Sequence, residues 1–114
     1  MNLRNNVQLI GNLGNDPAII NTSNEKKLVR FSIATTDYIQ DNGELKTKTY
    51  WHNIIAWGGM ADTIVKKCTK GTEVIINGKL VNRSYEDKTG TKKYITEVVV
   101  NEIICRTGII TTTL

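Results

Sequence analysis

The sequence is poor in the residues from which enzymes build metal centres and nucleophile sites. Its 114 residues include one histidine, His52, and two cysteines, too few for a two-histidine metal site or a conventional zinc cluster. Their spacing also favours no Cys/His nucleophile pair. Cys68 and Cys105 form no CxxC pair and sit beside apolar residues, which predicts two buried reduced thiols but does not exclude a disulfide between them. We therefore expect no catalysis, no metal and no cofactor.

Long hydrophobic runs are also missing. No apolar stretch reaches the length of a signal peptide or of a membrane span, so we expect a cytoplasmic protein without a membrane partner. The length suits a single domain. Lys and Arg number 15 against 11 Asp and Glu, and the resulting charge of +4 modestly favours a polyanionic partner.

Short β-branched runs recur along the chain and are separated by turn residues, which indicates an all-β barrel. Alternation is clearest where Val29, Phe31 and Ile33 are interleaved with Arg30 and Ser32. Asn42-Gly43 predicts a tight turn. The five predicted strands cover residues 6–13, 27–37, 46–57, 73–85 and 92–106.

One segment has helical periodicity. Met60, Ile64 and Cys68 fall at i, i+4 and i+8, and Gly71 is a natural stop. A helix after the third of five strands is typical of the OB-fold, a five-stranded Greek-key barrel. We predict an OB-fold domain over residues 1–106 and a short C-terminal tail over 107–114, whose conformation the pattern leaves open.

The segment Gly11-Asn12-Leu13-Gly14 superficially resembles a phosphate-binding loop. Such a loop needs a following helix whose N-terminus meets the phosphate, whereas Asp16-Pro17 leads here into another extended segment. We interpret the two glycines as a strand bend at a barrel corner and the turn after it.

Aromatic residues are few, but their positions are informative. Trp51 and Trp57 lie six residues apart on one predicted strand, so a regular pleat puts both on the same face. The strand pattern alone does not decide whether that face is core or surface. Tyr38 and Tyr85 lie near predicted hairpin tips, in polar surroundings. Basic residues accompany these rings or occur elsewhere as candidate phosphate contacts: Arg4, Lys46, Lys48, Lys70, Arg83, Lys88, Lys92 and Lys93.

Aromatic and basic residues interleaved on an OB barrel point to unpaired nucleic acid. Every base has a π-face, so stacking on rings holds any sequence, while Lys and Arg neutralise the phosphates. A duplex hides those faces. The pattern therefore favours single strands.

Several segments together resemble a known family. Residues 9–17, 31–36 and 51–58 closely resemble the bacterial single-stranded DNA-binding proteins (SSB), and the similarity continues through Lys70-Gly71, residues 78–80, Tyr94 and residues 96–100. It covers about residues 3–106. The resemblance implies sequence-independent binding and protection of single-stranded DNA in replication, recombination and repair.

The resemblance also assigns roles to residues. Four aromatic positions that stack on bases fall on Tyr38, Trp51, Trp57 and Tyr85, and Arg83, Lys70 and Lys93 match basic positions. A homotetramer is implied, or a dimer, with its interface at the first strand (Val7, Leu9) and near His52. The sequence departs from the family at Asn53, Gly59 and Ser84, where relatives commonly place Arg or Lys.

A further departure concerns the C-terminus. Such proteins usually continue through a flexible linker to an acidic tip that recruits replication and repair enzymes, whereas this sequence reads Thr111-Thr112-Thr113-Leu114. Partners that depend on the tip are therefore not expected. Three other interpretations stay open: an RNA-binding OB barrel, a primosomal relative that mainly contacts proteins, and a structural subunit whose aromatic residues form an oligomer interface.

Overall fold

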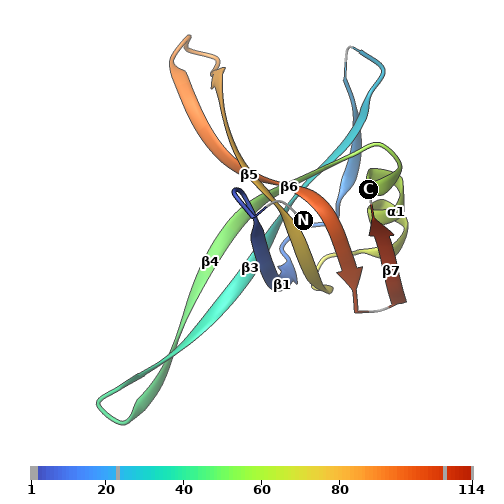
Figure 1. Cartoon of the computed structure of the whole chain (residues 1–114). Coiled ribbons are helices and arrows are strands. Elements are labelled where there is room, and N and C mark those ends of the chain that lie inside the picture. The colour runs from blue at the N-terminus through green and yellow to red at the C-terminus, as the bar shows by residue number, and fades with distance from the viewer. Residues whose placement is uncertain (1–2, 23, 107, 114) are drawn as a thin grey trace.

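The computed structural model describes residues 3–22, 24–106 and 108–113, and the side chains of these residues up to Arg106. Strands dominate, and one helix lies between β4 and β5 (Figure 1). In chain order the elements are β1 Val7–Leu13, β2 Ala18–Asn21, β3 Lys27–Asp41, β4 Glu44–Trp57, α1 Gly59–Lys67, β5 Glu73–Glu86, β6 Lys92–Cys105 and β7 Gly108–Thr113.

Five of these strands form a closed barrel. They follow the order β1-β5-β6-β4-β3, and β1 returns to pair with β3 at Asn12–Ala34 and Leu13–Ile33. The pairings are antiparallel except between β4 and β6. These two strands run parallel, with Asn53 opposite Glu97 and Ile55 opposite Val99. Gly11 permits the closure, because a Cβ atom there would overlap the carbonyl of Ala34 on the crossing strand. This architecture confirms the predicted OB-fold.

The barrel interior is filled by aliphatic side chains. Val29, Ile33, Ile54, Ile76 and Val100 are each at most 1% exposed and belong to one contiguous cluster. Burying each such side chain stabilises the fold by roughly 1.5–3 kcal/mol. Because side chains alternate along a strand, the positions between these residues point outward.

Helix α1 covers one end of the barrel with the predicted apolar stripe. Met60, Ala61 and Ile64 are fully buried, and Cys68 is 1% exposed. The prediction that the helix runs to Gly71 was wrong. The helix ends at Lys67, because Cys68 already has extended backbone, and Gly71, at φ +90°, belongs to the turn that leads into β5.

The β3–β4 and β5–β6 hairpins extend beyond the barrel in different directions (Figure 1). β3 and β4 stay paired as far as Asp41–Glu44, so both strands are longer than predicted. Their turn is the predicted Asn42-Gly43, with both residues at positive φ. The β5–β6 tip is organised by Asp87, which accepts hydrogen bonds from Thr89 and Thr91. The bond from the Thr89 side chain leads the interactions that lower the pKa of Asp87.

Two strands were not predicted. β2 pairs with β3, with Ala18 opposite Arg30 and Asn21 opposite Lys27. β7, which lies in the segment expected as a tail, pairs with β6. Residues 107 and 114 of that segment lie outside the described part of the chain. Within the described part, no helix is long and apolar enough to cross a membrane.

Candidate nucleic-acid interface

The outward surface of β3, β4 and β6 carries the predicted tryptophans. Phe31 and Ile54 face each other across β3 and β4 and are buried in the core. The odd-numbered residues of β4 therefore point outward, including Trp51 and Trp57, as the six-residue spacing predicts. Trp51 is 63% exposed and Trp57 39% exposed. Neither ring belongs to the barrel core.

The turn after β1 supports the Trp51 ring. A Cβ atom on Gly14 would overlap Cζ3 of the Trp51 indole and approach Oγ of Ser32 to 2.8 Å, so the indole lies against the bare backbone of this glycine. Asn15 fixes the turn, since its Oδ1 accepts hydrogen bonds from the backbone N–H and the hydroxyl of Ser32 at 2.9 and 3.0 Å. Gly14 thus serves as a seat for Trp51 as well as a turn residue.

Strand register connects Tyr38 and Tyr85 to the same face. Tyr38 lies four residues beyond Ala34, which pairs with Trp51. On β5, Tyr85 lies four residues beyond Val81, which pairs with Glu97 of β6. Glu97 also pairs with Asn53 of β4, which lies between the two tryptophans. Paired residues share a face, as do residues an even number apart on one strand. Tyr38 and Tyr85 are 71% and 45% exposed. The four predicted rings therefore lie on one connected surface, which we call the aromatic face.

The predicted basic residues divide between two faces. Arg83 and Lys93 share the aromatic face, since they occupy odd positions on β5 and β6 beside Tyr85 and Ile95. Lys46, Lys48 and Lys92 occupy even positions and point to the other side of the sheet. Lys88 lies at the β5–β6 tip, and Arg4 and Lys70 lie in exposed turns.

Two exposed tyrosines were not predicted as candidate site residues. Tyr50 and Tyr94 are 41% and 75% exposed and point to the side opposite the aromatic face. Lys48 Nζ lies 5.3 Å from the centroid of the Tyr50 ring, and Lys92 Nζ lies 5.6 Å from that of Tyr94. These distances fit cation–π contacts. On the aromatic face, the Arg83 guanidinium lies 5.7 Å from the Tyr85 centroid.

A buried carboxylate lies within the aromatic face. Glu97 is 2% exposed; its Oε1 accepts a hydrogen bond from Arg83 Nε at 2.6 Å, and its Oε2 is 3.4 Å from Arg30 Nε. The hydrogen bond to Glu97 raises the pKa of the Arg83 guanidinium above its ordinary value. Arg30 was missed in the sequence, although its outward position between Val29 and Phe31 could have been read from the alternation.

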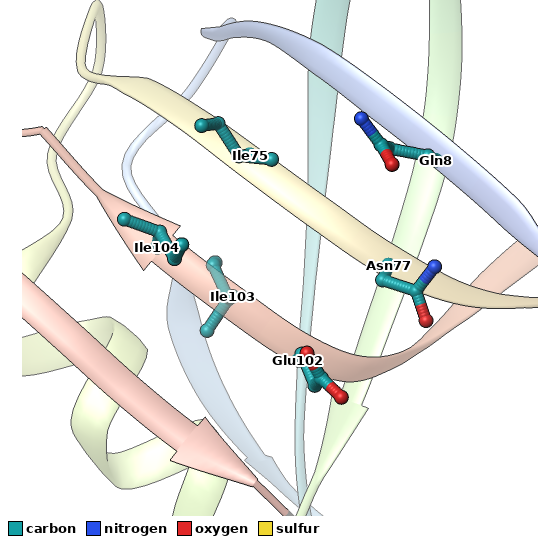
Figure 2. A pocket seen from close by; sticks show the side chains of 6 residues that line it. All are labelled: Gln8, Ile75, Asn77, Glu102, Ile103 and Ile104. Carbon is teal, nitrogen blue, oxygen red and sulfur yellow. The ribbon is translucent and has the colours of Figure 1, made fainter. Parts of the chain in front are cut away.

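The predicted interface residues occupy inward positions. Val7 and Leu9 are half-buried and pack against the core, and His52 Nε2 lies 2.8 Å from the Thr35 hydroxyl. On the outward side of this sheet, Ile10, Ile75 and Ile104 stand opposite one another on β1, β5 and β6 and are 38–51% exposed. Figure 2 shows Ile75 and Ile104 beside the polar neighbours Gln8, Asn77 and Glu102, around a pocket in this surface.

Both cysteines are thiols buried near the end of the helix, as predicted. Burial, together with a hydrogen bond to Cys105, raises the pKa of Cys68 to about 12. A thiol with such a pKa is protonated at neutral pH and is a poor nucleophile. Among the residues that the structure describes, no group of three His, Cys, Asp or Glu side chains could hold a metal ion.

Comparisons with known proteins agree with this geometry. A sequence model of the "Single-strand binding protein family" matches residues 4–105. The chain belongs to this family. Its members are DNA-binding proteins that catalyse no reaction.

Among curated relatives, "Single-stranded DNA-binding protein 1" of Chlorobaculum tepidum is 45% identical over 101 residues, covering 87% of this chain and 62% of the relative. A protein of the same name from Xylella fastidiosa is 39% identical, covering 87% of this chain and 74% of the relative. The chain thus spans about two thirds of the length of the curated relatives that it matches. A solved structure, "Plasmodium falciparum SSB complex with ssDNA", is similar with a TM-score of 0.78 and 34% identity, covering 92% of this chain and 98% of that one.

Proposed function

We propose that this chain binds single-stranded DNA without sequence preference, by stacking bases on Tyr38, Trp51, Trp57 and Tyr85. The observation that carries the proposal is the placement of these four exposed rings on one connected face. A base stacked on such a ring contributes about 1–3 kcal/mol, whichever base it is. Membership of the single-strand binding family supports the same function, and so does a structural relative described as a complex with single-stranded DNA.

Phosphate contacts accompany the stacking. Arg83 and Lys93 share the aromatic face and are placed to neutralise phosphates between stacked bases. Lys46, Lys48, Lys88 and Lys92 lie on the two projecting hairpins, and Arg4 and Lys70 lie in turns. We infer that this second group contacts DNA that continues past the face. The biological role would be protection of unpaired DNA in the cytoplasm, at the nucleoid, during replication, recombination and repair.

Titration with oligothymidine, oligouridine and a matching duplex tests the proposal. We expect quenching of Trp51 and Trp57 fluorescence by oligothymidine, and an affinity that falls steeply as salt rises. The duplex should bind much more weakly, because its bases are already stacked on one another. Equal affinity for single strand and duplex would contradict the proposal, and tighter binding of oligouridine would favour an RNA-binding barrel.

We further propose that the chain assembles with copies of itself, as a homotetramer or a dimer. Among the described residues, β3 pairs with β1 only at Asn12 and Leu13, so residues 7–10 leave one edge of β1 open to a strand from a second copy. The exposed row Ile10–Ile75–Ile104 adjoins this edge and would be buried by a second sheet. In such an assembly Val7, Leu9 and His52 would support the interface from the inward side of the sheet.

A further inference from the structure

The buried carboxylate of Glu97 lies in the middle of the aromatic face. On β6 it pairs with Asn53 of β4, which stands between Trp51 and Trp57. The other buried side chains are apolar, with the exception of Thr72, among the residues that the structure describes. A carboxylate placed in such surroundings loses its hydration, so its position calls for a physical explanation.

Two arginines from different strands compensate this charge. Arg83 of β5 approaches one carboxylate oxygen at 2.6 Å, and Arg30 of β3 approaches the other at 3.4 Å. Both contacts use the Nε atom of the guanidinium. Each guanidinium has five N–H donors. The Arg30 side chain is still 42% exposed and the Arg83 side chain 38% exposed. Donors therefore remain available to a ligand on the face.

Stability alone does not account for this cluster. A buried ion pair is weak support for a fold, since apolar side chains of similar volume often stabilise it as well or better. The cluster has two cations for one anion, so one positive charge remains uncompensated. Arg83 also lies 5.7 Å from the Tyr85 ring, so fixing Arg83 helps to fix that ring. These features suit a surface that binds an anion beside stacked bases.

The position of Arg30 strengthens this interpretation. Arg30 pairs with Ile55, which lies between Asn53 and Trp57 on β4. Arg30, Asn53 and Glu97 line one shallow hollow of the aromatic face. A strand whose bases stack on the two tryptophans would pass its phosphodiester groups close to this hollow. Guanidinium groups bind phosphate oxygens in a two-pronged geometry, provided that they are correctly oriented.

We propose that Glu97 is a positioning residue that holds Arg30 and Arg83 as a fixed pair of phosphate-binding groups between the stacking rings. The proposal rests on the proposed single-stranded DNA binding and adds Arg30 to the phosphate contacts. Fixing a flexible side chain before binding removes the loss of conformational freedom that binding would otherwise impose.

The substitution Glu97→Gln separates positioning from simple electrostatics. Removal of a negative charge from a DNA-binding face should by itself tighten binding. If Glu97 positions the arginines, the variant should instead bind oligothymidine about fivefold more weakly for each arginine released. Glu73→Gln is the matched control, because it breaks the 2.7 Å pair of Glu73 with Arg106 at the opposite end of β5 from Arg83. We expect this control to bind no more weakly than the unsubstituted chain.

Arg30 provides a second test, which leaves Glu97 and its 2.6 Å hydrogen bond from Arg83 in place. Arg30→Gln should lower the slope of log affinity against log salt by about 0.7, the value for one phosphate contact on a single strand. Arg30→Lys should keep the slope but weaken binding, because lysine lacks the two-pronged donor geometry. A residue with only a structural role would change the melting temperature without changing the salt slope.

The outcomes are distinct. If the unsubstituted chain does not bind oligothymidine, the proposed function falls, and the role of Glu97 with it. If the unsubstituted chain binds but Glu97→Gln binds equally well or more tightly, only the positioning role is overturned. Should Glu97→Gln fail to fold, the Arg30 variants decide, and an unchanged salt slope in Arg30→Gln overturns the proposal.

Discussion

Replacement of Trp51 by alanine is the sharpest test of the aromatic face. Trp51 is 63% exposed, so roughly a third of its surface contacts the rest of the protein. A fully buried aromatic side chain covers about 150–250 Å², so the substitution removes on the order of 80 Å² of buried surface. At about 25 cal/mol per Å², the free energy of unfolding falls by at most about 2 kcal/mol. Because typical domains have a free energy of unfolding of about 5–15 kcal/mol, the variant should stay folded.

The expected loss of binding is of a different size. Removal of one stacking ring takes away about 1–3 kcal/mol per base, which raises Kd for oligothymidine about 5- to 150-fold. Fluorescence anisotropy of a labelled oligothymidine measures this change at fixed salt, and circular dichroism establishes that the variant is folded. Trp57 is a less clean target, because it is only 39% exposed and its removal disturbs more packing.

Tyr50→Ala is the matched control for Trp51→Ala. Tyr50 is the adjacent residue on β4, is 41% exposed and points to the other side of the sheet. Its removal takes away no proposed stacking ring and leaves the charge of Lys48 in place, so Kd should change by less than about twofold. Similar losses in the two variants would refute the assignment of binding to one face, and so would an unchanged Kd in Trp51→Ala.

Three further outcomes are expected. Gly14→Ala sets a methyl group against the Trp51 indole, so Kd for oligothymidine should rise about fivefold while circular dichroism is unchanged; an unaltered Kd would show that the seat is dispensable. In the unfolded chain the Cys68 thiol ionises above its ordinary pKa of 9.0, whereas in the folded protein it stays protonated up to its raised pKa of about 12. The free energy of unfolding should therefore fall by up to about 1.4 kcal/mol per pH unit in that interval, more steeply than in Cys68→Ala, and equal slopes in urea titrations would contradict this. Ile75→Lys should shift the sedimentation coefficient towards that of a single chain, and unchanged sedimentation would argue against an interface at this row.

The barrel could be predicted because its strands alternate strongly. Val29, Phe31 and Ile33 point inward with polar residues between them, and the stripe of Met60 and Ile64 has helical spacing. The strands β2 and β7 have weaker signals, because each is short and is defined by its pairing with a neighbour. Strand pairing depends on tertiary structure, which local periodicity does not contain.

The candidate site was predictable to a similar degree. The six-residue spacing of Trp51 and Trp57 correctly puts both on one face. Lys46 and Lys48 were selected because they are close to Trp51 in the sequence. Both lie an even number of residues from Tyr50, however, so like Tyr50 they point to the side of the sheet opposite the aromatic face. The contact of Arg30 with Glu97 joins residues far apart in the chain and could be seen only in the folded structure.

Exposed rings are a liability that the fold reduces by partial support. Contiguous apolar surface promotes association between protein molecules. The aromatic face would be such a surface if its rings made no contacts with the rest of the protein. The Trp51 indole lies against Gly14, and Arg83, held by Glu97, lies over Tyr85. Each support restricts a ring without burying it, so the ring loses less conformational freedom when a base stacks on it. The contacts that limit exposed apolar area therefore also prepare the face for bases, and weakening either support should reduce affinity for single strands more than it reduces the stability of the barrel.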